Sequence, residues 1–247
     1  MKIFITLCLL FTSIYANAMS FYTVNLPPFS LVSDQQISGP FKDVASEACR
    51  IAGLKCEFKS APWKRIMSGI KDGHYEACFV VGKNKSRSDW MYFTTEIAET
   101  EYGFFYHTNS KRPVESKSAL SGKTVIVHDK SNTHKQLLKL QQKIPSLKIS
   151  VHNDINTAIK MFAKGRFGDS TLLYGNRDII QAMYKEIGLD NVKYTFKDKP
   201  ITYRFGLSKK SVKLNEFNRF DMVLRKMKAS GQIKKIFASY ELRAAKN

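Results

Sequence analysis

The stretch PWKRIMSGIKDGHYEACFVV, residues 62–81, contains the pattern that decides the fold. After the first proline, apolar side chains recur at the i, i+3, i+4, i+7 spacing of an amphipathic helix: Trp63, Ile66, Met67 and Ile70. Gly73 ends this helical pattern, and an uninterrupted apolar run of strand length follows at residues 77–81. The stretch therefore predicts a helix followed by a buried strand.

The same alternation extends toward the N-terminus. Residues 21–26 have the composition of a strand, which Pro27-Pro28 ends. Gly39-Pro40 then begins a helix that stops at Gly53, and the short strand KCEF follows at residues 55–58. This strand–helix order predicts a parallel sheet with helices on both faces.

A polar stretch, residues 110–123, separates this first unit from a second one. The second unit repeats the alternation, with strands at 124–128, 147–151 and 171–174 and helices at 133–143, 155–163 and 179–187. The chain then continues with the strand YRFGLS and two amphipathic helices, at residues 203–208, 214–230 and 233–240. Two α/β lobes predict a cleft between them, with the ligand at the carboxyl ends of the strands.

The first eighteen residues have the pattern of a secretory signal peptide. Lys2 precedes a mostly apolar run, and Ala16-Asn17-Ala18 offers the small residues that a signal peptidase recognises. The run is shorter than the roughly 20 residues that a membrane helix needs. We expect cleavage after Ala18 and a periplasmic protein; the alternative is a buried N-terminal strand.

The chain is strongly basic, with 40 Lys and Arg against 21 Asp and Glu, so its formal charge is +19. Such a surface attracts anionic groups. Export and the dispersal of the lysines along the chain argue against nucleic acid as a partner. The alternative is a cationic surface with no specific partner.

Three cysteines follow the predicted signal peptide: Cys49, Cys56 and Cys78. Cys49 lies late in a predicted helix and Cys56 early in the next strand, so we expect these two to form a disulfide in an oxidising compartment. The alternative is three buried thiols that pack as small apolar groups. No CxxC or HxxxH spacing occurs, and we expect no metal and no cofactor.

Several motifs occur in a fixed order from about Phe21 to Tyr240. They are LPPFS, GPFKDVASEACRIAGLKCEF, PWKRIMSGIKDGHYEACF, NKSRSDWMYFT, LSGKTVIVHDKSNT, AIKMFAKGRFGD and MKASGQIKKIFASY. In this order and spacing the chain resembles the family 3 extracellular solute-binding proteins, which include the periplasmic amino-acid receptors of ABC importers.

The resemblance implies an α/β fold of type II, in which two lobes joined by two crossing hinge strands close on a solute. It places lobe one at residues 19–106 and 201–247 and lobe two at residues 107–200, after the signal peptide at 1–18. The C-terminal helices are then expected to pack on lobe one.

Arg87 matches the arginine with which the family binds the α-carboxylate of its solute. A guanidinium group is always charged and offers two parallel donors to a carboxylate. The family's threonine in this turn is Asn84 here, which can still donate and accept hydrogen bonds. The alternative for Arg87 is a solvated turn residue, and we give that interpretation to Lys83 and Lys85.

In lobe two, Ser131, Asn132 and Thr133 stand where the family begins a helix at its ligand. Backbone N–H groups there attract an anion, and ordinary N-capping is compatible with that role. The family places an aspartate after the lobe-two strand to bind an α-ammonium group. No acid occupies that position here, and Asn176 follows the strand as the candidate ligand-binding residue.

Aromatic residues line such clefts in the family. Phe29 follows the proline pair, and Trp63 with Arg65 begins a helix. A ring there covers the apolar part of a solute or a cation. The alternative for Trp63 is a core residue, because it shares the apolar face of its helix.

The resemblance implies a non-catalytic protein that binds a small polar, carboxylate-bearing solute, anionic or zwitterionic, and delivers it to an ABC transporter permease. We expect a monomer. One alternative is a dehydratase-like enzyme with an acid supplied by Glu96, Glu99 or Glu101. The other is a ligand-sensing accessory protein that docks on a membrane receptor.

Overall fold

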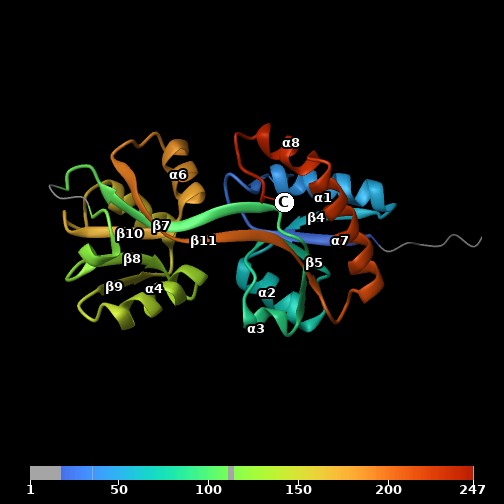
Figure 1. The fold of residues 1–247 in the computed structure, drawn as a ribbon, viewed down its shortest axis with the longest axis horizontal. Helices are drawn as coiled ribbons and strands as arrows, with labels where there is room; N and C mark the ends of the chain where they lie inside the picture. Colours follow the sequence, from blue (N-terminus) through green and yellow to red (C-terminus); the bar gives the residue numbers. More distant parts are fainter. Residues whose placement is uncertain (1–17, 35, 111–113, 247) are drawn as a thin grey trace, which may run out of the picture.

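Two long strands connect the two halves of the molecule (Figure 1). The computed structural model describes residues 18–34, 36–110 and 114–246 of the 247-residue chain. The connecting strands, β7 (Ala98–His107) and β11 (Val192–Ser208), pair antiparallel along the whole of β7. The predicted signal peptide lies outside the described residues except for Ala18.

The first half has a parallel sheet that is completed by the end of β11. Its strands are β4 (Cys56–Ser60), β1 (Met19–Thr23) and β5 (Ala77–Val81), in that spatial order. β11 joins antiparallel to β5 and also pairs with the short strand β6 (Met91–Phe93). A separate hairpin consists of β2 (Leu31–Ser33) and β3 (Gln36–Ser38).

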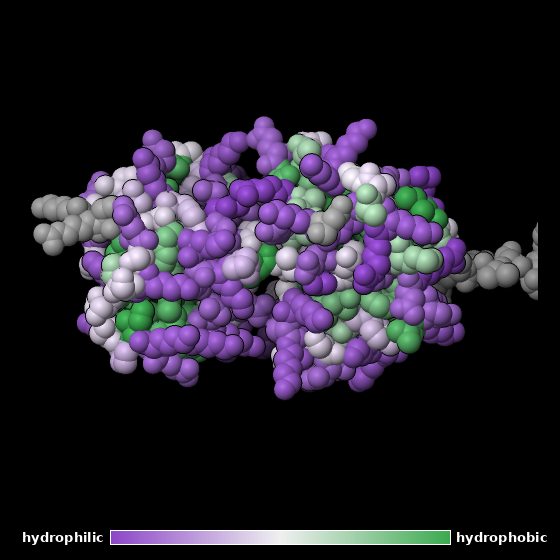
Figure 2. Space-filling view, viewed as in Figure 1, coloured by the Kyte–Doolittle hydropathy of each residue, from purple (hydrophilic) through white to green (hydrophobic). Residues whose placement is uncertain are grey.

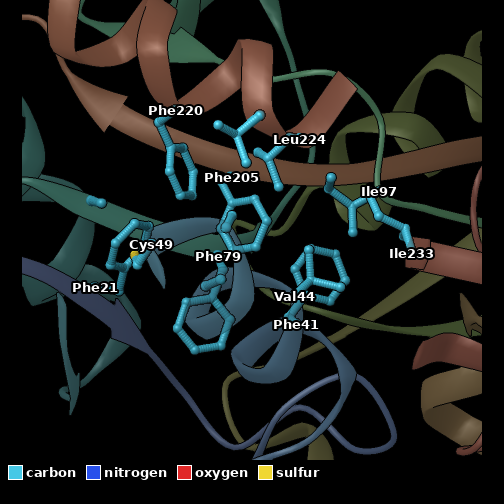
Figure 3. Packing of buried hydrophobic residues seen from close by; sticks show 14 of the residues in the cluster. Phe21, Phe41, Val44, Cys49, Phe79, Ile97, Phe205, Phe220, Leu224 and Ile233 are labelled. Carbon is cyan, nitrogen blue, oxygen red and sulfur yellow. The ribbon is translucent and has the colours of Figure 1, made fainter. Parts of the chain in front are cut away.

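Among the described residues, five helices belong to this half: α1 (Pro40–Ala52), α2 (Trp63–Asp72), α3 (Lys85–Ser88), α7 (Leu214–Ala229) and α8 (Gln232–Ala238). Pro40 occupies the first turn of α1, where its missing N–H costs nothing. Gly53 ends α1 in the left-handed conformation at φ 61°. Figure 3 shows the core beneath α1, where Phe41 packs against Phe79 of β5 and Phe205 of β11.

The second half repeats the design with three parallel strands beside β7. They are β10 (Thr171–Asn176), β8 (Thr124–His128) and β9 (Lys148–His152). Its helices are η1 (Lys117–Leu120), α4 (Asn132–Lys143), α5 (Ile155–Ala163) and α6 (Arg177–Glu186). Alternate residues of β8 enter separate cores, since Val125 and Val127 belong to one apolar cluster and Ile126 to another.

The predicted α/β architecture is confirmed, with some shifts in its elements. β1 spans residues 19–23 rather than the predicted 21–26, because the N–H of Leu26 already donates to the carbonyl of Ser30 in a turn. The predicted strand YRFGLS is the end of the much longer β11. The lobe boundaries at 106/107 and 200/201 fall within β7 and β11, and they stay a prediction.

The structure has a disulfide between Cys49 of α1 and Cys56 of β4, with its sulfur atoms 1.97 Å apart. The turn at Gly53 brings the end of the helix back to the start of the strand. Cys78 is a free thiol in the core, and burial raises its pKa to about 12. Among the described residues, no helix has the length and apolar character that crossing a membrane requires.

Candidate functional site

Arg87 lies in the turn that follows the buried strand β5. Asn84 caps the single-turn helix α3, because its Oδ1 accepts a hydrogen bond from the Arg87 N–H at 3.0 Å. The side chain of Arg87 turns back toward the strand, and its Nη1 donates to the carbonyl of Gly82 at 3.0 Å. The guanidinium group is therefore held at the carboxyl end of β5.

The surroundings of this guanidinium are aromatic rather than acidic. Its central carbon lies 5.5 Å from the centroid of the Trp63 ring, within the range of a cation–π contact. Arg87 is mostly buried, and burial lowers its pKa. No carboxylate in the described part of the chain forms an ion pair with it. An arginine stays protonated at neutral pH, so the site holds a positive charge without a counter-ion.

Two tyrosines from the connecting strands, Tyr102 and Tyr203, lie near enough to Arg87 to interact with its charge. Tyr203 lies opposite Ala98, and Tyr102 follows four residues further along β7, so both side chains project to the same face. Burial raises the pKa of Tyr102 to about 12 and that of Tyr203 well above its ordinary value. Both phenols therefore stay neutral and can act as hydrogen-bond donors.

The sequence did not identify these tyrosines as site residues. Nothing in the local sequence distinguishes them from core aromatics. Their position follows from the pairing of two strands that lie about a hundred residues apart in the chain.

Predicted ligand-binding residues from the two halves contact each other at the junction between the halves. The Nδ2 of Asn84 donates to the Oδ1 of Asn132, the first residue of α4, at 3.3 Å. Ser131 caps α4 by accepting from the N–H of His134 at 3.0 Å, and its hydroxyl lies 2.6 Å from that of Thr133. The structure therefore brings the start of α4 to the Arg87 turn.

The other predicted site residues have different surroundings. Phe29 is only 1% exposed and packs edge-on against Phe41 and Tyr203, so its ring supports the site from the core. Asn176 is also buried; it caps α6 and donates to the Tyr203 hydroxyl at 3.2 Å. Arg65 is exposed on α2.

A cavity of about 740 Å³ adjoins these residues at the junction of the two halves. Gly82, Asn84, Tyr102 and Asn132 line it, together with side chains of α4, β11 and the C-terminal segment. Arg87 contacts Gly82 and Asn84 but is not among the lining residues. Figure 2 shows hydrophilic side chains gathered along this junction, where the surface is hollowed. A volume of this order fits a small-molecule site.

Two of the glutamates near the junction are engaged with arginines, and a third, Glu99, lines the cavity. Glu96 forms an ion pair with Arg204, and Glu101 forms one with Arg177 at 2.9 Å. The Tyr194 hydroxyl also donates to Glu101 at 2.8 Å. Within the described ranges, no group of three or more His, Cys, Asp and Glu residues is arranged to hold a metal ion.

Many solved structures share this fold. One is a histidine kinase sensor domain with similarity to periplasmic binding proteins, at a TM-score of 0.79 and 16% identity, covering 94% of this chain and 98% of that one. Another is an ancestral arginine-binding protein bound to arginine, at a TM-score of 0.75 and 18% identity, with 90% and 97% of the chains covered. A third comes from work on glutathione import in Gram-positive bacteria via GshT and the cystine ABC importer TcyBC of Streptococcus mutans, at a TM-score of 0.77 and 18% identity, covering 90% and 94%.

No curated protein matches the sequence. The model of the bacterial extracellular solute-binding proteins, family 3, matches residues 21–243, nearly the whole described chain. The architecture is the type II periplasmic-binding-protein fold that the sequence resemblance implied. On this match, the chain belongs to family 3 of the bacterial extracellular solute-binding proteins.

Proposed function

We propose that this protein binds a small polar solute through a carboxylate group and that Arg87 is the residue that binds it. The observation that carries the proposal is the mostly buried guanidinium without an acidic partner in the described chain. A buried charge is costly unless it is paired. A solute carboxylate accepts two parallel N–H bonds from a guanidinium and so supplies the missing charge.

The proposed mechanism is closure of the two halves around the solute. Asn84 and Asn132 already join the halves by a hydrogen bond, and β7 and β11 are the connections about which the halves move. A solute that contacts both halves binds the closed form more tightly and shifts the population toward it. We propose that the closed form of this exported, monomeric protein delivers the solute to an ABC importer in the periplasm.

The charge around the site supports an anionic or zwitterionic solute over a cationic one. The cavity beside Arg87 is lined by more lysines than glutamates. The arginine-binding and glutathione-import structures show that the fold serves solutes of different charge. Their identities to this chain are too low to transfer a solute.

A second candidate is a sensory role, in which the closed form signals to a membrane receptor. The histidine kinase sensor domain covers 94% of this chain at a TM-score of 0.79, so the same fold serves a sensor. A dehydratase is the weaker alternative, because two of its three candidate acids, Glu96 and Glu101, are held in ion pairs with arginines, which leaves Glu99 as the acid that lines the cavity.

The proposal is tested by titrating the mature protein with a panel of amino acids and organic acids in a calorimeter. Carboxylate compounds should bind, and the corresponding primary amides should not. Arg87→Ala should weaken binding of the solute by about 30-fold or more, because the loss of a buried charge–hydrogen-bond contact costs about 2 kcal/mol or more.

Arg166→Ala is the matched control, since Arg166 is exposed and the change removes the same charge. Circular dichroism checks that both variants fold. Equal affinity of the Arg87→Ala variant and the wild type would remove Arg87 from the site. Smaller dimensions in solution by X-ray scattering when the solute is added would support closure.

A further inference from the structure

The polar groups around Arg87 donate hydrogen bonds and carry no negative charge. The guanidinium group has several N–H donors, and the bond to the Gly82 carbonyl is its one side-chain hydrogen bond to the described residues. Tyr102 and Tyr203 interact with this charge. Burial raises the pKa of both phenols, so both stay neutral. The surroundings of Arg87 therefore suit a group that accepts hydrogen bonds.

Asn176 determines which hydrogen bonds the Tyr203 hydroxyl can form. The Asn176 Oδ1 accepts from the N–H of Ile179 at 3.0 Å in the cap of α6, and this bond orients the amide. Its Nδ2 then donates to the hydroxyls of Thr100 and Tyr203, each at 3.2 Å. A hydroxyl that accepts from an amide keeps its own hydrogen to donate. No described residue accepts the hydrogen of Tyr203, so it remains for a ligand.

The acids closest to these groups are bound to an arginine or project to another face. Asp178 is the acid whose charge acts on Tyr203, and its carboxylate accepts from the Nε of Arg177 at 2.9 Å. Glu101 accepts from the same arginine at 2.9 Å. The two-residue alternation of β7 places Glu99 on the face of Glu101, opposite to the face of the site tyrosines. A ligand bound to Arg87 thus meets no free carboxylate on that face among the described residues.

An ammonium group is poorly accommodated in such surroundings. It has only donors, and it loses favourable hydration unless an acid or several acceptors replace the water. In an amino acid the ammonium is attached to the carbon next to the carboxylate, so a carboxylate bound to Arg87 brings the two cations close together. Their repulsion has no compensating acid there. A hydroxyl at the same place is neutral and can accept from Tyr203.

We propose that the solute site selects carboxylates without an ammonium group on the neighbouring carbon, namely α-hydroxy acids and unsubstituted carboxylic acids, over amino acids. This inference rests on the proposed function, because it takes Arg87 as the residue that binds the carboxylate. Tyr203 donates to an oxygen of the solute, and Asn176 is the positioning residue that keeps the Tyr203 hydrogen available. The site discriminates by charge, since an ammonium and a hydroxyl group have similar volumes.

Calorimetric titration of the wild-type protein at neutral pH with matched sets of ligands tests the selectivity. Each set contains an amino acid, its α-hydroxy acid and its unsubstituted acid, such as alanine, lactate and propanoate. The sets cover small, aliphatic, aromatic, acidic and basic side chains. In the set whose side chain fits, the hydroxy acid should bind about tenfold more tightly than the amino acid, or better, because only the ammonium loses its hydration without an acidic partner.

Asn176→Asp tests the cause of the selectivity. Aspartate also caps helices, so the start of α6 is kept, and it places a carboxylate beside Tyr203. The ratio of hydroxy-acid affinity to amino-acid affinity should fall about tenfold, because the new charge attracts the ammonium. Asn218→Asp is the matched control: it adds the same charge at an exposed position of α7 and should keep the wild-type ratio. Circular dichroism checks that both variants fold, and the wild-type titrations decide alone if Asn176→Asp does not.

The outcomes separate this inference from the proposed function. An amino acid that binds as tightly as its hydroxy acid, with binding lost in Arg87→Ala, overturns the selectivity and leaves the proposed function standing. Loss of that amino-acid binding in Glu99→Gln would then identify Glu99 as the acid that binds the ammonium. Binding of no compound, or binding that Arg87→Ala does not weaken, overturns the proposed function. An unchanged ratio in a folded Asn176→Asp variant, or an equal change in Asn218→Asp, overturns the role of Asn176.

Discussion

Arg87 and Arg177 occupy corresponding places in the two halves, yet their surroundings differ in charge. Each follows a strand of its parallel sheet at the start of a helix, and each is mostly buried. Arg177 donates to Glu101 and to Asp178, both at 2.9 Å. Arg87 donates to the carbonyl of Gly82 and lies over the Trp63 ring. One cation is compensated within the chain and the other is not.

The pKa values of the two groups follow this difference. Burial lowers the pKa of both guanidinium groups. At Arg177 the hydrogen bond and charge of Asp178, with the charge of Glu101, outweigh burial and raise its pKa overall. At Arg87 no acid opposes burial, and its pKa stays lowered. Arg177 thus has its counter-ions within the fold, whereas Arg87, the proposed solute-binding cation, has no acidic partner in the described chain.

Of the changes that test this comparison, the removal of the Arg177 charge is expected to have the largest effect, a loss in the free energy of unfolding. Arg177→Met leaves Glu101 and Asp178 without their main partner, and breaking a buried pair costs about 3 kcal/mol or more. Partial exposure reduces this, so we expect a loss of about 2 kcal/mol in the free energy of unfolding. Urea denaturation followed by circular dichroism measures it.

Arg166→Met is the control, because it removes an exposed arginine from the same half. An Arg177→Met variant as stable as this control would show that the ion pairs contribute nothing. The contrast between the two arginines would then lose its energetic basis.

The sequence predicted the α/β order of elements because helix and strand periodicities are local. Apolar residues four apart in α2 and the continuous apolar run of β5 are each set by neighbours in the chain. The role of Arg87 was predicted differently, from the resemblance of NKSRSDWMYFT to the family's motif, and it stays a prediction. Tyr102 and Tyr203 could not be found in this way, since their approach depends on the register of β7 against β11. Phe29 is buried because α1 and β11 cover it, and the sequence around Phe29 does not predict packing by these distant elements.

A smaller effect is expected from Asn84→Asp, which gives Arg87 a nearby carboxylate of the kind that Arg177 already has. Asn84→Asp retains an oxygen to accept from the Arg87 N–H, so the cap of α3 is kept. It also adds a negative charge at a residue that lines the cavity beside Arg87. We expect the affinity for a carboxylate solute to fall about tenfold, or about 1.4 kcal/mol, because like charges repel at a partly buried site.

Asn84→Ser is the control, since serine also caps helices but adds no charge. Titration of the solute into both variants separates the effect of charge from the loss of the bond to Asn132, which both variants share. Equal affinities of the two variants would place the solute carboxylate away from Asn84.

The smallest expected effect is the change in the free energy of unfolding when Arg87 is replaced. Arg87→Met deletes a buried charge whose bonds in the described chain are the Gly82 carbonyl and an aromatic contact. Methionine fills similar apolar volume, and replacing an uncompensated charge by an apolar group relieves its desolvation cost. We expect the free energy of unfolding without solute to change by less than about 1 kcal/mol, in either direction. Urea denaturation beside Arg177→Met measures the difference, and a loss as large as that of Arg177→Met would show that Arg87 is a structural cation like its counterpart.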